Sequence, residues 1–224
     1  MTKALAVYSS VDSPGRKDAT GAFAPEAKAF SRLHSAVVVP IDCIGNGKSV
    51  RFRQLMQAIH DHGDGLELLA LFCHGWSNGI QFGVSMAQVD ELAQRIASSG
   101  VRPDLRIALY ACSTADADND DDVRVGPATD GGFADRLRDG LVAHGLEGGW
   151  IDAHKTAGHC SQNPFVVRFD VEAGRIGGEW LVQSHGPYWQ QWIRALQGKG
   201  DLRLRFSTMT REQVIAEIRY PLPN

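Results

Sequence analysis

Two residues with reactive side chains each follow an apolar run in this sequence. His74 comes directly after the run from Leu68 to Cys73, and Cys112 comes directly after the run from Leu105 to Ala111. Each run has the length and composition of a strand that is buried on both faces. A thiolate is a strong nucleophile, and a neighbouring imidazole can accept the thiol proton. The pair therefore predicts thiolate attack on a carbonyl carbon, provided that the fold brings the two residues together.

The segment between the two residues has the pattern of a crossover connection. Ser85 is a good N-cap residue, and apolar residues recur at helical spacing behind it, so a helix is expected from Ser85 to Ser99. Strand, helix and strand then form a βαβ unit, in which the two strands run parallel with their carboxyl ends on one edge. Open α/β sheets bind their ligands at that edge. We therefore expect His74 and Cys112 to be neighbours in space.

Taken singly, neither residue indicates catalysis. A lone histidine at a strand end is more often a structural hydrogen-bonding group, and a lone cysteine on an apolar strand is more often a small buried hydrophobe. Their joint placement, with Gly75 directly after His74, favours a catalytic pair. A tetrahedral oxyanion needs backbone N–H donors, and a glycine lets the main chain approach a substrate closely.

Composition restricts the class of protein. The chain has 224 residues, of which 43% are hydrophobic and 22% charged, as in an ordinary soluble domain. Its net charge of −3 gives no reason to expect nucleic acid as the main partner. No stretch approaches the roughly 20 apolar residues of a membrane span, and the amino terminus has the pattern of a strand rather than a signal peptide. The four scattered cysteines include no CxxC pair, so we expect a cytoplasmic protein with free thiols and no zinc site.

The remaining pattern predicts one α/β domain over residues 1–224. Its core is expected at about 3–153, and residues 154–224 are expected to complete the sheet and the substrate loops. A loop or small hairpin is expected at 75–83. Strands are predicted at 3–9, 36–41, 150–153, 165–169, 179–182 and 202–206, and helices at 25–33, 50–62, 133–142, 189–196 and 214–218. His159 and Cys160 fall in a loop after the strand at 150–153, and the sequence assigns them no role.

A strand ending in His-Gly, followed by a helix and a strand ending in Ala-Cys, resembles the caspase-like (clan CD) cysteine peptidase superfamily. Caspases, metacaspases, gingipains and the bacterial CHAT domains belong to it. The segment from Tyr110 to Ala115 is most similar to the Ala-Cys-x-Thr signature of CHAT-type members. The resemblance covers residues 66–146, and the separation of 38 positions from histidine to cysteine is shorter than the roughly 50 of caspases. The sequence lacks both the Gln-Ala-Cys-x-Gly of caspases and the Cys-x-Ser-Gly of metacaspases, so it leaves the specificity open.

The resemblance implies a three-layer α/β/α sandwich with a mainly parallel central sheet. It also implies an endopeptidase that acts through a thioester, with His74 as general base and Cys112 as nucleophile. The N–H of Gly75, alone or together with that of Cys112, would form the oxyanion hole. The partners that it implies are a protein or peptide substrate and a regulatory or sensor protein, and it leaves the oligomeric state open.

An aspartate-rich stretch at 116–122 follows the cysteine, where relatives build part of the substrate pocket. One hypothesis is that Asp116 and Asp118 select a basic residue at the cleaved position. Calcium is a second hypothesis, because Asp116, Asp118 and Asp120 match the first three ligands of an EF-hand loop. An aspartate, however, stands where that loop requires glycine, and Pro127 stands where it requires glutamate. A solvated acidic loop is the third interpretation, and we predict no cofactor.

Two other functions fit parts of the pattern. In an α/β-hydrolase, a His-Gly segment lies near the oxyanion hole, but the nucleophile needs small residues two positions before and after it. Tyr110 and Thr114 occupy those positions around Cys112, and no GxSxG motif occurs. A degenerate caspase-like module used for binding or regulation is the non-enzymatic alternative. The second His-Gly pair, at His185, precedes no Ala-Cys strand and ranks below His74.

Overall fold

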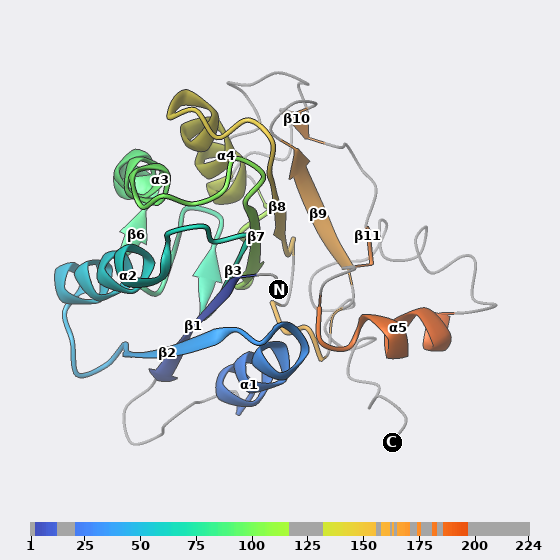
Figure 1. Ribbon diagram of the computed structural model, residues 1–224. Helices are drawn as coiled ribbons and strands as arrows, with labels where there is room; N and C mark the ends of the chain where they lie inside the picture. Colours follow the sequence, from blue (N-terminus) through green and yellow to red (C-terminus); the bar gives the residue numbers. More distant parts are fainter. Residues whose placement is uncertain are drawn as a thin grey trace.

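A mainly parallel β-sheet forms the centre of the protein (Figure 1). This computed structural model describes residues 3–12, 21–116, 132–155, 158–161, 163, 165–170, 174–175, 181–182 and 186–196. Within these ranges the sheet has eight strands in the order β10-β9-β8-β7-β3-β1-β2, with β11 paired to β9. The strands are β1 (Ala4–Val11), β2 (Val37–Asp42), β3 (Leu68–Phe72), β7 (Arg106–Tyr110), β8 (Trp150–Ala153), β9 (Phe165–Asp170), β10 (Gly174–Arg175) and β11 (Leu181–Val182). Strands β2, β1, β3, β7 and β8 pair in parallel, and β9 pairs antiparallel with β8, β10 and β11.

Strands β3 and β7 lie side by side, as the crossover pattern predicts. All five residues of β3 are buried, and so are four of the five residues of β7. Their register pairs Leu68 with Arg106 and Phe72 with Tyr110. Because the register is unbroken, the residues two positions beyond Phe72 and Tyr110 leave the sheet at the same level.

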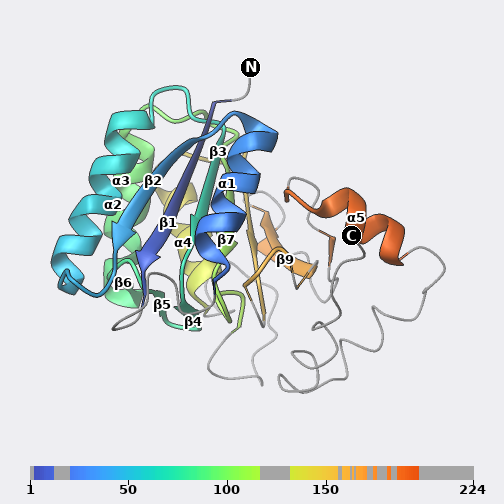
Figure 2. The same cartoon turned by 90° about the horizontal axis from the view of Figure 1, so that it is seen from below.

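Helices pack on both faces of the sheet. They are α1 (Phe23–His34), α2 (Lys48–His62), α3 (Val89–Ser98), α4 (Phe133–Ala143) and α5 (Trp189–Leu196). Alternate residues of β3 belong to different clusters, Leu69 with residues of α2, α3 and α4, and Ala70 with Phe23 and Phe30 of α1. Figure 2 shows α1 on the opposite side of the sheet from α2 and α3. The predicted α/β class with a mainly parallel sheet is therefore confirmed.

The connection after β3 is a small three-stranded sheet, so the expected small hairpin is present and has an extra strand. It consists of β4 (Gly75–Trp76), β5 (Gly79–Ile80) and β6 (Val84–Ser85). Figure 2 shows it beyond the carboxyl ends of the parallel strands. Ser85 then caps a 3-10 turn, Met86–Gln88, which leads into α3, and Gln88 completes a capping box.

Some predicted boundaries need correction. The first helix begins at Phe23, so Pro25 is its third residue rather than its first. The predicted pairing of 165–169 with 179–182 exists between β9 and β11, but β10, which the sequence did not indicate, pairs with the other end of β9. The strand predicted at 202–206 and the helix predicted at 214–218 lie outside the described residues.

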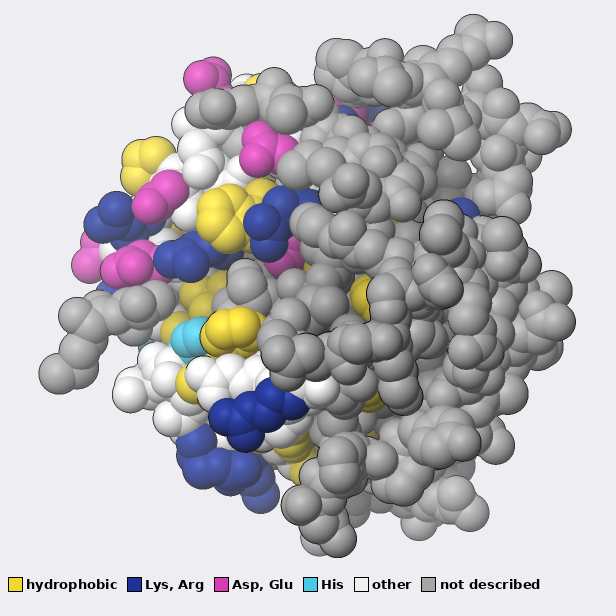
Figure 3. Space-filling view, turned by 90° about the vertical axis from the view of Figure 1, so that its right-hand side faces the viewer, with side chains coloured by type: hydrophobic (Ala, Val, Ile, Leu, Met, Phe, Trp, Pro, Cys, Tyr) yellow, Lys and Arg dark blue, Asp and Glu magenta, His cyan; other side chains and the backbone are white. Residues whose placement is uncertain are grey.

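The described helices are unsuited to crossing a membrane, and the described surface carries charges of both signs. Within the described ranges, every helix is too short or too polar to cross a lipid bilayer. Figure 3 shows acidic and basic side chains interspersed on the described part of one face. This mixture of signs agrees with the small net charge of −3.

Candidate active site

The fold places His74 and Cys112 at the ends of adjacent parallel strands. Each residue stands two positions beyond the last register pair, Phe72 with Tyr110. The Cys73 N–H donates to the carbonyl of Tyr110, the last residue of β7, at 3.2 Å, so the pairing continues one residue past the end of β3. The structure thus brings together the two residues that the sequence predicts to be catalytic.

Gly75 packs directly against the segment that carries the thiol. A Cβ atom built on Gly75 would lie 2.7 Å from the Cβ of Ala111 and 2.8 Å from the carbonyl oxygen of Cys112. It would also lie 2.8 Å from the methyl group of Thr114. Glycine is therefore required here by contact between the two strand ends, a reason that the sequence did not reveal. Its predicted role in an oxyanion hole stays a prediction.

A buried carboxylate, which the sequence did not single out, lies within hydrogen-bond distance of the imidazole of His74. The Nε2 atom of His74 lies 2.8 Å from Oδ2 of Asp12, and the exposed fractions of the two side chains are 32% and 0%. An ionised carboxylate only accepts hydrogen bonds, so Nε2 carries the ring proton. Nδ1 is then the nitrogen that can accept a proton from a thiol. Asp12 immediately follows β1, the strand next to β3.

Gln81 holds His74 and Asp12 in place together. Its side-chain amide donates to the Asp12 carbonyl at 3.2 Å, and its side-chain oxygen accepts the His74 N–H at 3.3 Å. Its own backbone N–H donates to the His74 carbonyl at 2.9 Å. Gln81 is largely buried, at 9% exposure. The small β4–β6 sheet therefore fixes the backbone on both sides of the histidine–aspartate contact.

Cys112 lies at the start of a strained turn. The next residue, Ser113, has a φ of 57°, in the left-handed region that non-glycine residues rarely adopt. Two contacts hold the turn: the Thr114 hydroxyl donates to the Ala111 carbonyl at 3.1 Å, and the Ala115 N–H donates to the His154 carbonyl at 3.0 Å. Backbone strain of this kind costs about 1–3 kcal/mol and is concentrated at functional sites.

A backbone N–H is aimed at the sulfur from a third segment. The N–H of Gly158 donates to Sγ of Cys112 at 3.3 Å, across 46 positions in the sequence. A Cβ atom on Gly158 would lie 2.3 Å from the carbonyl carbon of Ala111, so a side chain cannot be accommodated without moving the loop. Such a donor can accept negative charge that forms at sulfur or beside it. No pattern of residue types signals this contact, because it depends on where the loop after β8 lies.

Aromatic contacts connect α1 to both sides of the site. The Phe23 ring meets His74 edge-on, with ring centroids 5.1 Å apart. It also stacks against His159, with centroids 5.5 Å apart and planes at 24°. Phe23 therefore packs between the candidate base and the loop that carries Gly158.

The four cysteines differ in burial: one thiol is partly exposed and three are buried. Cys112 is partly exposed, whereas Cys43, Cys73 and Cys160 are buried. Burial raises the pKa of the Cys43 thiol, and it raises the pKa values of Cys73 and Cys160 well above the usual value. Because the thiolate is the nucleophile, Cys112 is the thiol best placed to react.

His154, at the end of β8, is a buried neutral imidazole next to the site. Its side chain is fully buried, and neither ring nitrogen has a hydrogen-bond partner of ordinary geometry within the described ranges. Burial lowers the pKa of His154 to about 3; the neighbouring His159 adds to this effect, and the Phe165 backbone opposes it. His154 is therefore uncharged at neutral pH and contributes no positive charge to the site.

Of the acidic stretch at 116–122, the structure describes Asp116. Asp116 is half-buried, and its N–H donates to the Ser113 carbonyl at 3.1 Å, which places it directly after the strained turn. Asp118 and the rest of 117–131 lie outside the described residues, as does His185. Among the residues that the structure describes, no group of three or more His, Cys, Asp or Glu side chains could hold a metal ion. Basic specificity and calcium binding stay predictions.

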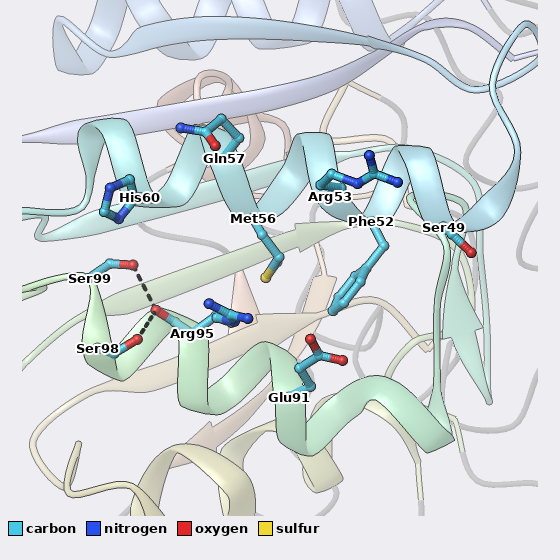
Figure 4. Close-up of a pocket in the computed structure, with 10 residues that line it drawn as sticks. All are labelled: Ser49, Phe52, Arg53, Met56, Gln57, His60, Glu91, Arg95, Ser98 and Ser99. Carbon is cyan, nitrogen blue, oxygen red and sulfur yellow. Dashed lines mark hydrogen bonds between the residues drawn. The ribbon is translucent and has the colours of Figure 1, made fainter.

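A groove of about 520 Å³ lies elsewhere, between α2 and α3 (Figure 4). Its lining includes Phe52, Met56, Glu91 and Arg95, and Figure 4 shows Phe52 and Met56 directed towards α3. These helices cover one face of the sheet, whereas His74 and Cys112 lie at its carboxyl edge. The lining contains no thiol, so the groove is not a second candidate for the same chemistry.

The residues at the carboxyl edge form a coherent set for nucleophilic chemistry. They are a partly exposed thiol, an imidazole at the neighbouring strand end, a buried carboxylate at Nε2 of that imidazole, and a backbone donor at the sulfur. This arrangement can activate a thiol and stabilise the charge that follows. The chain matches no protein-family model and no curated protein, so its function has to be inferred from this chemistry.

Proposed function

We propose that this protein is a cysteine endopeptidase of the caspase-like type, with Cys112 as nucleophile and His74 as general base. One observation carries the proposal: His74 and Cys112 stand just beyond the ends of adjacent parallel strands, and the buried carboxylate of Asp12 contacts Nε2 of the imidazole. The resemblance of the His-Gly and Ala-Cys-x-Thr segments to CHAT-type members supports the same assignment. Helices on both faces of a mainly parallel sheet support a three-layer α/β/α sandwich.

The first half of the reaction forms a thioester. Nδ1 of His74 accepts the thiol proton, and the Cys112 thiolate attacks the carbonyl carbon of the scissile peptide bond. Asp12 stabilises the imidazolium through the 2.8 Å contact to Nε2. When the tetrahedral intermediate collapses, the C–N bond breaks, and His74 returns the proton to the departing amine.

The second half releases the product. His74 takes a proton from water, the hydroxide attacks the thioester carbonyl, and the C–S bond breaks to regenerate the thiol. In both halves the negative oxygen needs backbone donors. The N–H of Gly75 is our candidate for that role, and the N–H of Gly158, now 3.3 Å from the sulfur, is a second.

The proposed substrates are proteins or peptides. Asp116 lies close behind the nucleophile, so a basic residue at the cleaved position is the preference that we propose, with Asp118 as a second acidic group. A regulatory or sensor protein is the proposed partner, by resemblance to bacterial relatives.

A labelling and cleavage experiment tests the function. The intact protein is treated with peptides that carry a thiol-reactive warhead after Arg, Lys, Asp or Leu, and the modified cysteine is located by mass spectrometry. We expect labelling at Cys112, fastest with the basic peptides, and cleavage of matching substrates that is lost in Cys112→Ala and His74→Ala. If Cys112→Ala kept all cleavage, or if other thiols reacted while Cys112 did not, the proposal would be wrong. Equal rates for all four peptides would reject only the basic preference.

A further inference from the structure

A carboxylate in α1 is buried against the loop that follows β8. The Glu26 side chain is 2% exposed. Its Oε2 accepts the Cys160 N–H at 3.2 Å, and its Oε1 accepts the Ser161 N–H at 2.9 Å together with the Ser161 hydroxyl. The first of these contacts spans 134 positions in the sequence. A buried carboxylate that accepts several N–H and O–H donors forms strong, charge-assisted bonds, so it fixes the backbone that donates them.

That same loop carries the donor to the nucleophile. Gly158, whose N–H reaches Cys112 Sγ, stands only two residues before Cys160. On another side of the loop, the Trp192 indole of α5 donates to the Cys160 carbonyl at 2.9 Å. The loop is therefore tied to α1, to α5 and to the sulfur. Among the described residues, its hydrogen bonds to α1 all go to Glu26, beside the ring contact between His159 and Phe23.

We propose that Glu26 is a positioning residue of the active site, which acts by holding the loop so that the Gly158 N–H stays on Cys112 Sγ. The inference deepens the proposed peptidase function and rests on it. Glu26 does not touch the reacting atoms. Its effect on Cys112 passes through the bonds to Cys160 and Ser161 and along the backbone to Gly158.

Two variants interrupt this connection at different points. Glu26→Gln keeps the size of the side chain, but its amide nitrogen cannot accept an N–H, so at least one bond to the loop is lost. Gly158→Ala leaves Glu26 intact and moves the donor, because its Cβ would lie 2.3 Å from the Ala111 backbone. The matched control is Glu91→Gln, the same change at an exposed site on α3.

The readout is the rate of alkylation of Cys112 by a small neutral reagent as a function of pH, with each cysteine followed by peptide mass spectrometry. The sign of the effect separates two mechanisms. Removal of a negative charge by itself would favour the thiolate and move the midpoint to lower pH, whereas loss of the N–H donor moves it to higher pH. The titratable groups at the neighbouring strand end, His74 and Asp12, are unchanged in every variant, and so is His159, whose Nδ1 lies 4.0 Å from Glu26 Oε2.

We expect both variants to slow Cys112 alkylation at pH 7 by about three- to tenfold, the effect of one ordinary hydrogen bond. The midpoint should rise in both, and the double variant should be no slower than the slower single one, because both act on one contact. Glu91→Gln should match the wild-type protein. An unchanged or lower midpoint in Glu26→Gln, or fully additive effects, would overturn the inference.

The buried cysteines report whether a variant remains folded. Cys43 and Cys73 should stay unlabelled throughout. If Glu26→Gln exposes them, Ser161→Ala takes its place, since it removes only the hydroxyl contact to Glu26, and an unchanged rate in that variant then refutes the inference. Alkylation needs no peptide cleavage. If the protein cleaves no peptide but shows the expected alkylation rates, the peptidase function is rejected and the positioning role of Glu26 is kept. If it cleaves peptides but Glu26→Gln leaves the alkylation rate unchanged, the peptidase function is kept and the positioning role is rejected.

Discussion

Substitution of Asp12 by asparagine tests the catalytic arrangement most directly. The carboxylate is fully buried and lies 2.8 Å from Nε2 of His74. When His74 takes the thiol proton, the hydrogen bond between the Asp12 carboxylate and a neutral imidazole becomes an ion pair. The asparagine side chain would keep the shape but not the charge, and its amide could donate to Nε2 and force the ring proton onto Nδ1, where it blocks proton transfer.

The size of the effect follows from the kind of bond that is lost. A hydrogen bond to a charged group contributes about 1.5–3 kcal/mol. If that stabilisation is present only in the transition state, kcat should fall about 10- to 150-fold while KM changes little. The assay is steady-state hydrolysis of the best peptide found with the wild-type protein, with urea unfolding as a check on the fold.

The neighbouring strand supplies a matched control. Asp42 ends β2 as Asp12 follows β1, but it is only half-buried and accepts the N–H groups of Ile44 and Gly45 rather than an imidazole. We expect Asp42→Asn to leave kcat unchanged. Wild-type rates in Asp12→Asn, alongside complete loss in Cys112→Ala, would refute the role of Asp12 as the group that orients the base.

Three further substitutions test packing and charge. Gly75→Ala should lower the free energy of unfolding by about 1–3 kcal/mol, because the new Cβ would lie 2.8 Å from the Cys112 carbonyl oxygen. The control Gly47→Ala, where a Cβ would have no neighbour within 4 Å, should lower it by about 0.5 kcal/mol. Equal losses for the two variants in urea unfolding would contradict this. Arg168→Leu should cost about 3–5 kcal/mol, because it removes the guanidinium that pairs with the fully buried Asp152 carboxylate, and changing both residues to leucine should restore most of the loss. His154 has a folded-state pKa of about 3, below its ordinary value of 6.5, so the unfolded chain binds the proton first and stability falls as pH drops between these values, by about 5 kcal/mol in total. His154→Leu should flatten that part of the pH profile of unfolding, and an unchanged slope would show that another group is responsible.

The strands and the reactive pair were predictable because their signals are local. Two apolar runs of matching length, joined by a capped helix, require parallel strands whose ends coincide, and His74 and Cys112 stand at those ends. The need for glycine after the histidine was also predictable, although its observed reason is contact with the Cys112 segment rather than approach to a substrate. Periodicity and capping act within one element, so they were sufficient here.

The supporting residues were not predictable from the same signals. Asp12 had the pattern of a polar turn, and its bond to His74 spans 62 positions. Finding it required knowing that β1 lies next to β3, which depends on the strand order of the whole sheet. Glu26 followed a proline in an apparently ordinary first helical turn, and its partners are backbone N–H groups, which leave no trace in residue types.

The contact between Gly158 and Cys112 has a consequence for biosynthesis. Cys112, His74 and Asp12 all precede β8 in the chain, but the Gly158 N–H that donates to the sulfur follows it. A ribosome-bound chain that ends before β8 therefore contains the thiol without the backbone that holds it. For the proposed peptidase, this order means that the site is complete only after β8 has joined β7 and the loop behind β8 has formed.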